Sequence, residues 1–146
     1  MKRNRGFTLF ELTIVLGLLT ILATGLFLST RSNYQRDLHN ASLLLQADFR
    51  YAQRRAMIEG RRYGVFFNIT QNRYYIALDT PREVIRTVYL QNGVHLRETS
   101  GPRLLFLPRG TASSGFRVTL NNGPYSQQLT ATVSGGRIRI FDIERR

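Results

Sequence analysis

The chain begins with a short basic stretch that gives way to a long apolar run. From Phe7 to Leu28 there are 22 residues, and the only ionisable side chain among them is that of Glu11. An α-helix rises about 1.5 Å per residue, so this run spans roughly 33 Å, which is enough to cross the apolar part of a bilayer. The pattern therefore predicts a membrane-spanning helix over residues 7–28.

Beyond the apolar run the helical pattern continues, but with apolar residues on one face only. Apolar side chains recur at steps of three or four residues, at Tyr34, Leu38, Ala41, Leu45, Phe49, Ala52 and Ala56. Gly60 suits the C-terminal cap of such a helix. We predict one helix from about Phe7 to Glu59, with residues 29–60 as its amphipathic half packed under the rest of the chain.

After Gly60 the pattern changes to short runs of Val, Ile, Phe and Tyr that are bounded by Gly, Pro and Asn, which is typical of strands. The predicted strands are Tyr63–Ile69, Arg73–Leu78, Val84–Leu90, Val94–Glu98, Leu104–Leu107, Phe116–Leu120, Leu129–Val133 and Arg137–Phe141. About eight strands on one helix indicate an α+β fold. We expect two small antiparallel sheets that form a β-rich head over residues 61–146.

The apolar run is longer than the core of an ordinary secretory signal, and no small-x-small cleavage site follows it. Removal of the whole segment is therefore disfavoured. Lys2, Arg3 and Arg5 flank the run on its N-terminal side, and such residues keep that end in the cytoplasm. We expect a single pass through the inner (cytoplasmic) membrane, with the head on the outer side.

Glu11 is out of place in an apolar span, because a carboxylate there costs on the order of 3 kcal/mol. One interpretation is that Glu11 lies close enough to the membrane interface to stay hydrated. The other is that a functional partner compensates its charge, which is the usual role of an intramembrane ionisable residue.

The segment Gly6-Phe7-Thr8-Leu9-Phe10-Glu11, followed by an apolar run, resembles the prepilin processing site of type IV pilins and type II secretion pseudopilins. The resemblance implies that a prepilin peptidase removes the leader, residues 1–6, by cutting between Gly6 and Phe7, and then methylates the new amine of Phe7. It also implies that Glu11 pairs with the N-terminal amine of a neighbouring pilin or pseudopilin subunit during filament assembly. Phe10 is bulkier than the branched aliphatic residue expected at its position.

Three segments of the head resemble the GspH/FimT class of minor pseudopilins and minor pilins. They are the Ala-Gln-Arg-Arg-Ala sequence at residues 52–56, Leu-Leu-Phe-Leu-Pro-Arg-Gly at 104–110 and Ser-Gly-Gly-Arg-Ile-Arg-Ile at 134–140. The class serves type II secretion or type IV pili, including pili that take up DNA. The resemblance therefore implies a subunit of a pilus or pseudopilus.

Charge adds a further candidate site. The chain has 21 Lys and Arg against 9 Asp and Glu, a net charge of +12, which favours polyanions such as nucleic acid, anionic lipid or acidic proteins. In the C-terminal strand, alternation directs Ile138 and Ile140 into the core and Arg137 and Arg139 outward, roughly 7 Å apart. Two guanidinium groups at that spacing suit successive phosphates of double-stranded DNA.

Gly136 to Arg139 also fits a Gly-Arg-x-Arg element that serves DNA binding in some DNA-uptake pilins which this class resembles. We expect Arg145 and Arg146 to extend the basic patch. The alternative is that the two strand arginines only keep a sheet edge soluble. Both interpretations stay open, and any DNA binding is expected to be directed to the backbone and sensitive to salt.

Catalytic chemistry has little support in the sequence. The chain has no cysteine, which excludes disulfides and thiol nucleophiles, and its two histidines, His39 and His95, stand far apart. There is no nucleophile-elbow motif, no phosphate-cradling glycine loop and no His-x-x-x-His pair. We predict a protein that is not an enzyme and needs no cofactor or metal.

Three functions therefore compete. The chain is a pseudopilin that drives protein secretion, a competence pilin that captures DNA, or an unprocessed single-pass membrane protein with an unrelated β head. Cleavage after Gly6 by prepilin peptidase separates the first two from the third. DNA retention by the head separates the second from the first.

Overall fold

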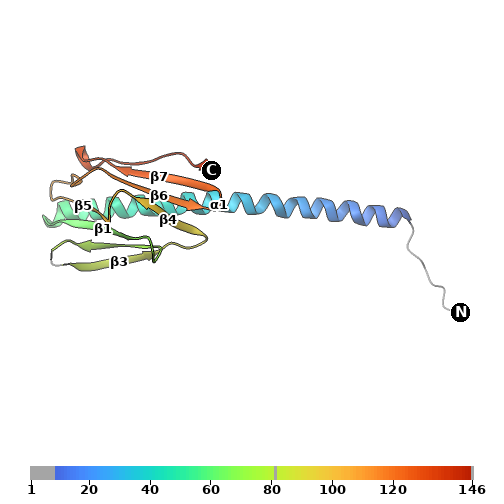
Figure 1. Cartoon of the computed structure of the whole chain (residues 1–146), viewed down its shortest axis with the longest axis horizontal. Helices are drawn as coiled ribbons and strands as arrows, with labels where there is room; N and C mark the ends of the chain where they lie inside the picture. The colour runs from blue at the N-terminus through green and yellow to red at the C-terminus, as the bar shows by residue number, and fades with distance from the viewer. Residues whose placement is uncertain (1–8, 81, 146) are drawn as a thin grey trace. The chain divides into compact units, whose positions relative to one another are not determined.

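A computed structural model describes residues 9–80 and 82–145, without the side chains of residues 24–32. The chain divides into two compact units, Met1–Asn33 and Tyr34–Arg146, and each is described by itself. Helix α1, Leu9–Glu59, supplies residues to both units (Figure 1). Gly60 follows its last residue with a φ of 63°, the left-handed conformation that glycine adopts at no steric cost, and this confirms the predicted cap.

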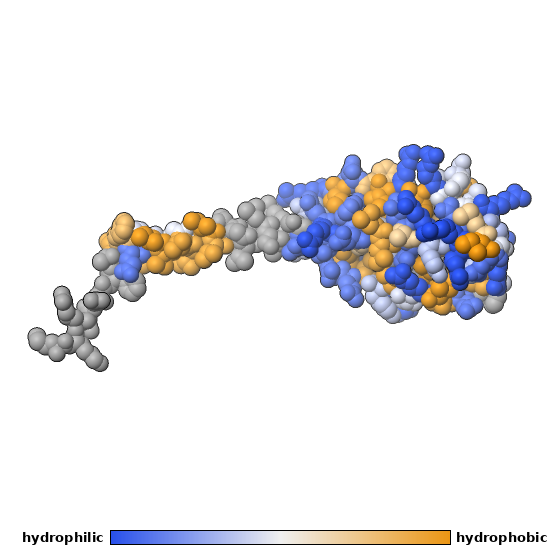
Figure 2. All heavy atoms as spheres, turned by 180° about the vertical axis from the view of Figure 1, so that it is seen from behind, coloured by the Kyte–Doolittle hydropathy of each residue, from blue (hydrophilic) through white to orange (hydrophobic). Residues whose placement is uncertain are grey.

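In the first unit, the described apolar side chains of α1 are exposed. Leu9 is 82% exposed and Phe10 is 75% exposed. In Figure 2, hydrophobic residues, coloured orange, cover much of the described surface of this unit. Among the described residues, no helix is both long enough and apolar enough to span a membrane. The predicted span over residues 7–28 extends beyond the part of α1 whose side chains are described.

The second unit contains two antiparallel sheets. The first sheet has four strands, in the order β3-β2-β1-β5. Their bounds are β1 Tyr63–Asn68, β2 Arg73–Leu78, β3 Glu83–Tyr89 and β5 Arg103–Phe106. Strand β3 forms one outer edge of this sheet, and β5 forms the other (Figure 1).

The second sheet has the order β4-β6-β7-β8, and β9 pairs with the remaining part of β7. Its strands are β4 Val94–Thr99, β6 Phe116–Asn122, β7 Tyr125–Ala131, β8 Ile138–Ile140 and β9 Glu144–Arg145, and a short 3₁₀ helix, Ser134–Gly136, precedes β8. A long helix with two antiparallel sheets confirms the predicted α+β fold.

Strand β7 starts four residues earlier than predicted, and β9 was not predicted. The predicted turn over residues 121–124 is only two residues long, because Asn122 already pairs with Tyr125. The polar residues that follow Tyr125 resemble a loop in the sequence, yet they continue the ladder with β6. Gln127, for example, pairs with Leu120 and donates a hydrogen bond from Nε2 to the carbonyl of Phe141 at 2.9 Å.

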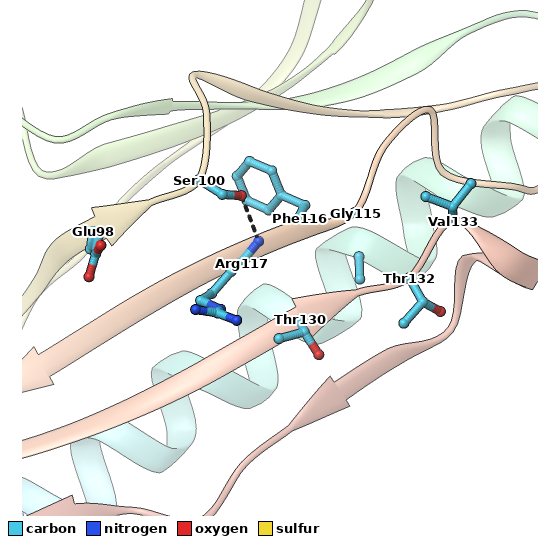
Figure 3. A pocket seen from close by; sticks show the side chains of 9 residues that line it. Glu98, Ser100, Gly115, Phe116, Arg117, Thr130, Thr132 and Val133 are labelled. Atoms are coloured by element: carbon cyan, nitrogen blue, oxygen red, sulfur yellow. Dashed lines mark hydrogen bonds between the residues drawn. The ribbon is translucent and has the colours of Figure 1, made fainter.

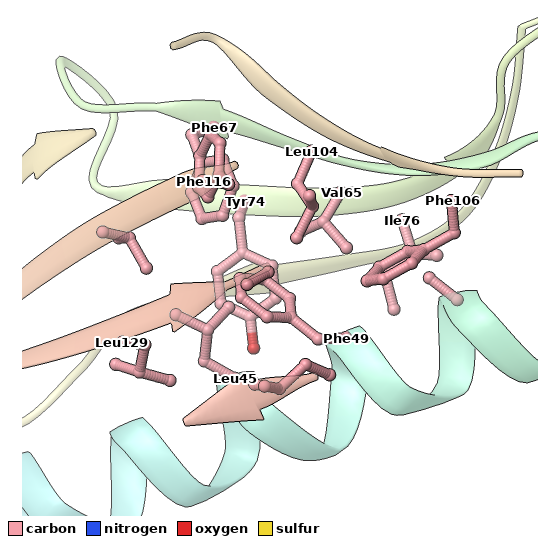
Figure 4. Close-up of a cluster of buried hydrophobic side chains, with 14 of the residues drawn as sticks. Leu45, Phe49, Val65, Phe67, Tyr74, Ile76, Leu104, Phe106, Phe116 and Leu129 are labelled. Carbon is pink, nitrogen blue, oxygen red and sulfur yellow. The ribbon is translucent and has the colours of Figure 1, made fainter. Parts of the chain in front are cut away.

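The core of the second unit lies between the two sheets and the helix (Figure 4). From α1 it takes Leu38, Leu45, Phe49, Ala52 and Ala56, all fully buried, which confirms most of the predicted stripe. Tyr34 is instead 42% exposed. The ring of Phe49 contacts Phe67 and Phe116 edge-on, at centroid distances of 6.2 Å and 6.5 Å, and so links α1 to both sheets.

One buried polar cluster joins α1 to the first sheet, and the sequence pattern did not predict it. The hydroxyl of Tyr74 donates to Asp48 Oδ2 at 2.7 Å, and Arg86 Nη1 lies 3.1 Å from Asp48 Oδ1. Burial, followed by the hydrogen bond to the Asp48 carboxylate, raises the pKa of Tyr74 well above its usual value. A buried acidic side chain is tolerated here because it has two donors.

Candidate functional site

The predicted processing site lies at the N-terminal end of the chain. Gly6 and Phe7 are outside the described residues. Glu11 lies in the first turn of α1, where its side chain is exposed. A carboxylate at this position interacts favourably with the positive end of the helix dipole.

The predicted Gly-Arg-x-Arg element begins in the turn between β7 and β8. Gly136 has a φ of 57° and is buried, and the 3₁₀ helix around it packs against Gln53 of α1. Gln53 Nε2 donates to the carbonyl of Gly110 at 2.6 Å, and a Cβ atom on Gly136 would collide with both groups. Gly136 is therefore needed for packing inside the head, and its part in DNA binding stays a prediction.

The two arginines of the element are both exposed, on either side of the buried Ile138. Arg139 pairs across the strands with Thr130 of β7, so its side chain leaves the sheet on the same face as Thr130. Arg137 and Arg139 line one shallow hollow on the outer face of the second sheet. We call this site the arginine hollow, and it is lined by Thr130, Thr132, Ser134, Arg137, Arg139 and Phe141.

A third arginine faces the same surface. Arg117 of β6 pairs with Thr130 from the side opposite to Arg139, and it lines a neighbouring hollow with Glu98, Ser100 and Thr132 (Figure 3). Its backbone N–H donates to Ser100 Oγ at 2.9 Å, which ties β6 to the end of β4. Alternation within β6 signals an outward Arg117, but nothing local in the sequence shows that β6 and β8 flank the same strand.

Arg145 does not extend the arginine hollow. It pairs with Tyr125 at the far end of β7, whereas Arg139 pairs with Thr130, five residues along the strand or about 17 Å away. Asp142 and Glu144 line another hollow on this face, together with Arg117. Arg145 lies apart from the hollow because the chain leaves β8 and returns beside the other half of β7. Arg146 lies outside the described residues.

The described residues contain no group of three or more His, Asp or Glu side chains that could hold a metal ion. His39 on α1 and His95 on β4 are both exposed.

The outer face of the second sheet offers guanidinium, hydroxyl and carboxylate groups in shallow hollows. Such groups suit binding by hydrogen bonds and charge.

Two family models, together with a long N-terminal helix and two antiparallel sheets, place the chain in the class of type IV pilin-like subunits. The family model described as type II transport protein GspH matches residues 41–136, so the chain belongs to this family. A second model, the prokaryotic N-terminal methylation motif, matches residues 1–27.

Solved structures show the same fold. The minor pseudopilin EpsH of the Vibrio cholerae type 2 secretion system aligns with a TM-score of 0.62 and 16% identity, over 72% of this chain and 96% of that one. The type IV minor pilin FimU of Pseudomonas aeruginosa aligns with a TM-score of 0.59 and 15% identity, over 72% of this chain and 93% of that one. No curated protein matches the chain by sequence.

Proposed function

We propose that the chain is a minor pilin or pseudopilin that is cut between Gly6 and Phe7, methylated on Phe7 and assembled into a filament through its N-terminal helix. The observation that carries this proposal is the methylation motif over residues 1–27, on a chain whose residues 41–136 match the GspH family. The head, residues 61–146, supplies the surface that the filament presents.

The exposed apolar side chains of α1 support this role. Apolar surface left in water costs about 25 cal/mol per Å² relative to burial, so the segment needs lipid or other helices around it. We infer that residues 7–28 anchor the processed subunit in the inner membrane and later pack among the helices of other pilin subunits. Lys2, Arg3 and Arg5 hold the leader on the cytoplasmic side, where a prepilin peptidase acts.

Glu11 has a specific part in this assembly. Cleavage before Phe7 creates a charged amine four residues away from Glu11 along the chain. In a bundle of subunits, the amine of one protomer and the Glu11 carboxylate of the next compensate each other's charge in an apolar setting. This pairing selects the correct axial offset between neighbouring helices.

Replacement of Glu11 tests the proposal. Glu11→Ala should leave cleavage intact but lower incorporation into filaments at least about tenfold, because removal of one partner of a buried ion pair costs about 3 kcal/mol or more. Sheared filaments and membranes from the native host are compared by quantitative immunoblot. Thr13→Ala, a small polar change two residues away, should assemble normally, and normal assembly of Glu11→Ala would refute the assigned role.

The arginine hollow supports a second candidate function, the binding of double-stranded DNA for uptake. Arg137 and Arg139 are exposed in one hollow, and Arg117 faces them across Thr130. Guanidinium groups spaced along one sheet face suit contacts with the phosphate backbone. The alternative is a pseudopilin for protein secretion that does not bind nucleic acid.

A gel-shift titration of the full chain in detergent, at rising salt, separates these two functions. Each lost phosphate contact lowers the slope of log K against log salt by about 0.9, so the Arg137→Gln/Arg139→Gln variant should lose about 1.8. Arg97→Gln/Arg103→Gln carries the same charge change at exposed positions outside the hollow and should bind nearly as wild type. Absence of DNA binding by the wild-type chain would leave secretion as the function, and equal binding by the two variants would show that the arginine hollow is not the DNA site.

A further inference from the structure

Strand β3 is an open sheet edge. It is the terminal strand of the order β3-β2-β1-β5, and no described strand pairs with its outer side. Six of its seven residues are exposed, and Val88 is half-buried. An edge of this kind presents backbone N–H and C=O groups on which another strand can form.

The edge is only partly protected against such pairing. Val84 is 53% exposed and Tyr89 is 57% exposed, and Ile85 is exposed too. Natural edges are blunted by lysine, proline, bulges or inward-facing charge. Strand β3 has one inward-facing charge, Arg86, and Asp48 neutralises it. Here a register shift opposite Ile76 and Ala77 interrupts the first part of β3, while Arg86 to Tyr89 pair regularly with β2. The regular half of the strand is therefore the part that is suited to accept a partner.

An apolar groove lies beside that half. It is formed by α1 on one side and by the end of β3 and the following loop on the other, and we call it the α1–β3 groove. Its apolar lining includes Ala41, Leu44, Val88 and Leu90, and Asp37, Asn40, Gln91 and Asn92 add polar groups at its border. Val88 pairs with the buried Tyr74, so it faces the helix side of the sheet. Side chains of an added strand that face the same way would enter this groove.

The opposite side of the edge is positively charged. Thr87 and Tyr89 pair with Tyr75 and Arg73 and face away from the helix. The guanidinium of Arg73 lies 5.7 Å from the centre of the Tyr89 ring, and its Nη1 donates to the Tyr89 hydroxyl at 3.1 Å, so its charge reaches across to β3. Arg73 itself is half-buried, and its Nε atom is buried and has no hydrogen-bond partner within the described residues.

Two charged groups on β3 itself bear on the choice of partner. Arg86 faces the helix, and its ion pair with Asp48 already compensates its charge. Glu83 lies at the start of β3, before the register shift. Beside the regular half, the cation of Arg73 thus lies on the face of Thr87 and Tyr89, while Asp37 lies on the groove side. This arrangement fits a partner with carboxylates on the Arg73 face only.

We propose that the β3 edge binds an extended acidic segment of another protein subunit, which adds as a fifth strand to the first sheet. Its apolar side chains occupy the α1–β3 groove, and its alternate carboxylates face Arg73. Main-chain hydrogen bonds provide the affinity, and the groove and Arg73 provide the selectivity. This inference goes beyond the proposed function, because it concerns neither the N-terminal helix nor the arginine hollow.

A synthetic peptide serves as the probe. An eight-residue peptide that alternates valine and glutamate, with a fluorescent label, is titrated with the full chain in detergent, and a valine–lysine peptide of the same pattern is the control. We expect saturable binding of the acidic peptide only. Hydrogen exchange of the β3 amides should slow at least about tenfold in the complex, as new main-chain bonds form.

Three variants test the location. Arg73→Gln should weaken binding about three- to fivefold, as expected for loss of one exposed ion pair. Thr87→Glu, which puts a like charge on the exposed face, should weaken it further. Arg97→Gln removes the same charge from β4 of the other sheet and should have no effect. Absence of peptide binding, equal binding by all variants, or pairing of β3 with β3 of a second copy of the chain would each overturn the proposal.

Discussion

The two halves of α1 contain similar apolar residues in opposite surroundings. In the first unit, Leu9 and Phe10 are among the most exposed residues, whereas in the second unit Leu45 and Phe49 are fully buried. Helix propensity does not distinguish the halves, since leucine is common in both. The difference is that two sheets pack against one face of the second half, whereas the described side chains of the first half are exposed.

This contrast separates two kinds of stability. The second half is stabilised by contacts that the chain supplies itself, including the edge contacts of Phe49 with Phe67 and Phe116. Under the proposed function, the first half depends on lipid or on the helices of other subunits. Substitutions in one half should therefore change folding, and substitutions in the other should change membrane binding and assembly.

The largest expected effect comes from the same substitution made in each half. Leu45→Ala should lower the free energy of unfolding by about 4 kcal/mol, because it leaves a cavity in a fully buried site. Leu16→Ala, at an exposed position, should change it by less than about 0.5 kcal/mol. Urea unfolding of the full chain in detergent, followed by circular dichroism, measures both. Equal losses would contradict the distinction between the halves.

A pair of adjacent glycines tests how closely the head packs on its own part of the helix. Gly136→Ala should cost about 3 kcal/mol, since the added methyl group meets Gln53 and the Gly110 carbonyl and φ is positive. Gly135→Ala has a similar φ but open space around it, and should cost about 1 kcal/mol. The same unfolding measurement applies. If the two variants were equally stable, the contact between this turn and α1 would not be tight.

The smallest effect appears only at high pH. Because Tyr74 has a raised pKa in the folded head, it keeps its proton above about pH 10, where the unfolded chain loses it. Stability from this group is therefore complete below pH 10 and falls above it, by about 1.4 kcal/mol per pH unit. Tyr74→Phe should make the free energy of unfolding fall less steeply with pH between pH 10 and 11, because the tyrosine's contribution is lost. An unchanged slope would mean that Tyr74 does not titrate on unfolding.

Much of the fold was predictable because the spacing of apolar residues and the residues that form turns are local features of the sequence. The stripe from Leu38 to Ala56 and the change at Gly60 both follow from spacing and glycine geometry. The beginning of β7 was not predictable, since Ser126 and Gln127 look like loop residues and become strand only through pairing with β6. The Asp48 cluster was missed for a similar reason, because its two donors come from β2 and β3.

The candidate site was predicted less completely. Alternation places Arg137 and Arg139 outward, and the structure has both in one hollow. The presence of Arg117 on the same surface and the distance to Arg145 depend on strand order, which no local pattern encodes. The sequence pattern assigned Gly136 to the DNA-binding element. In the structure, the lack of a side chain at Gly136 allows close contact with Gln53.

Processing between Gly6 and Phe7 is the claim on which the filament account depends, and mass spectrometry of the N-terminus of the protein purified from its native membrane tests it most directly. The account predicts a chain that starts at Phe7 and carries one methyl group on its amine. A chain that retains residues 1–6 would contradict the account, because no free amine would then lie near Glu11 to pair between subunits.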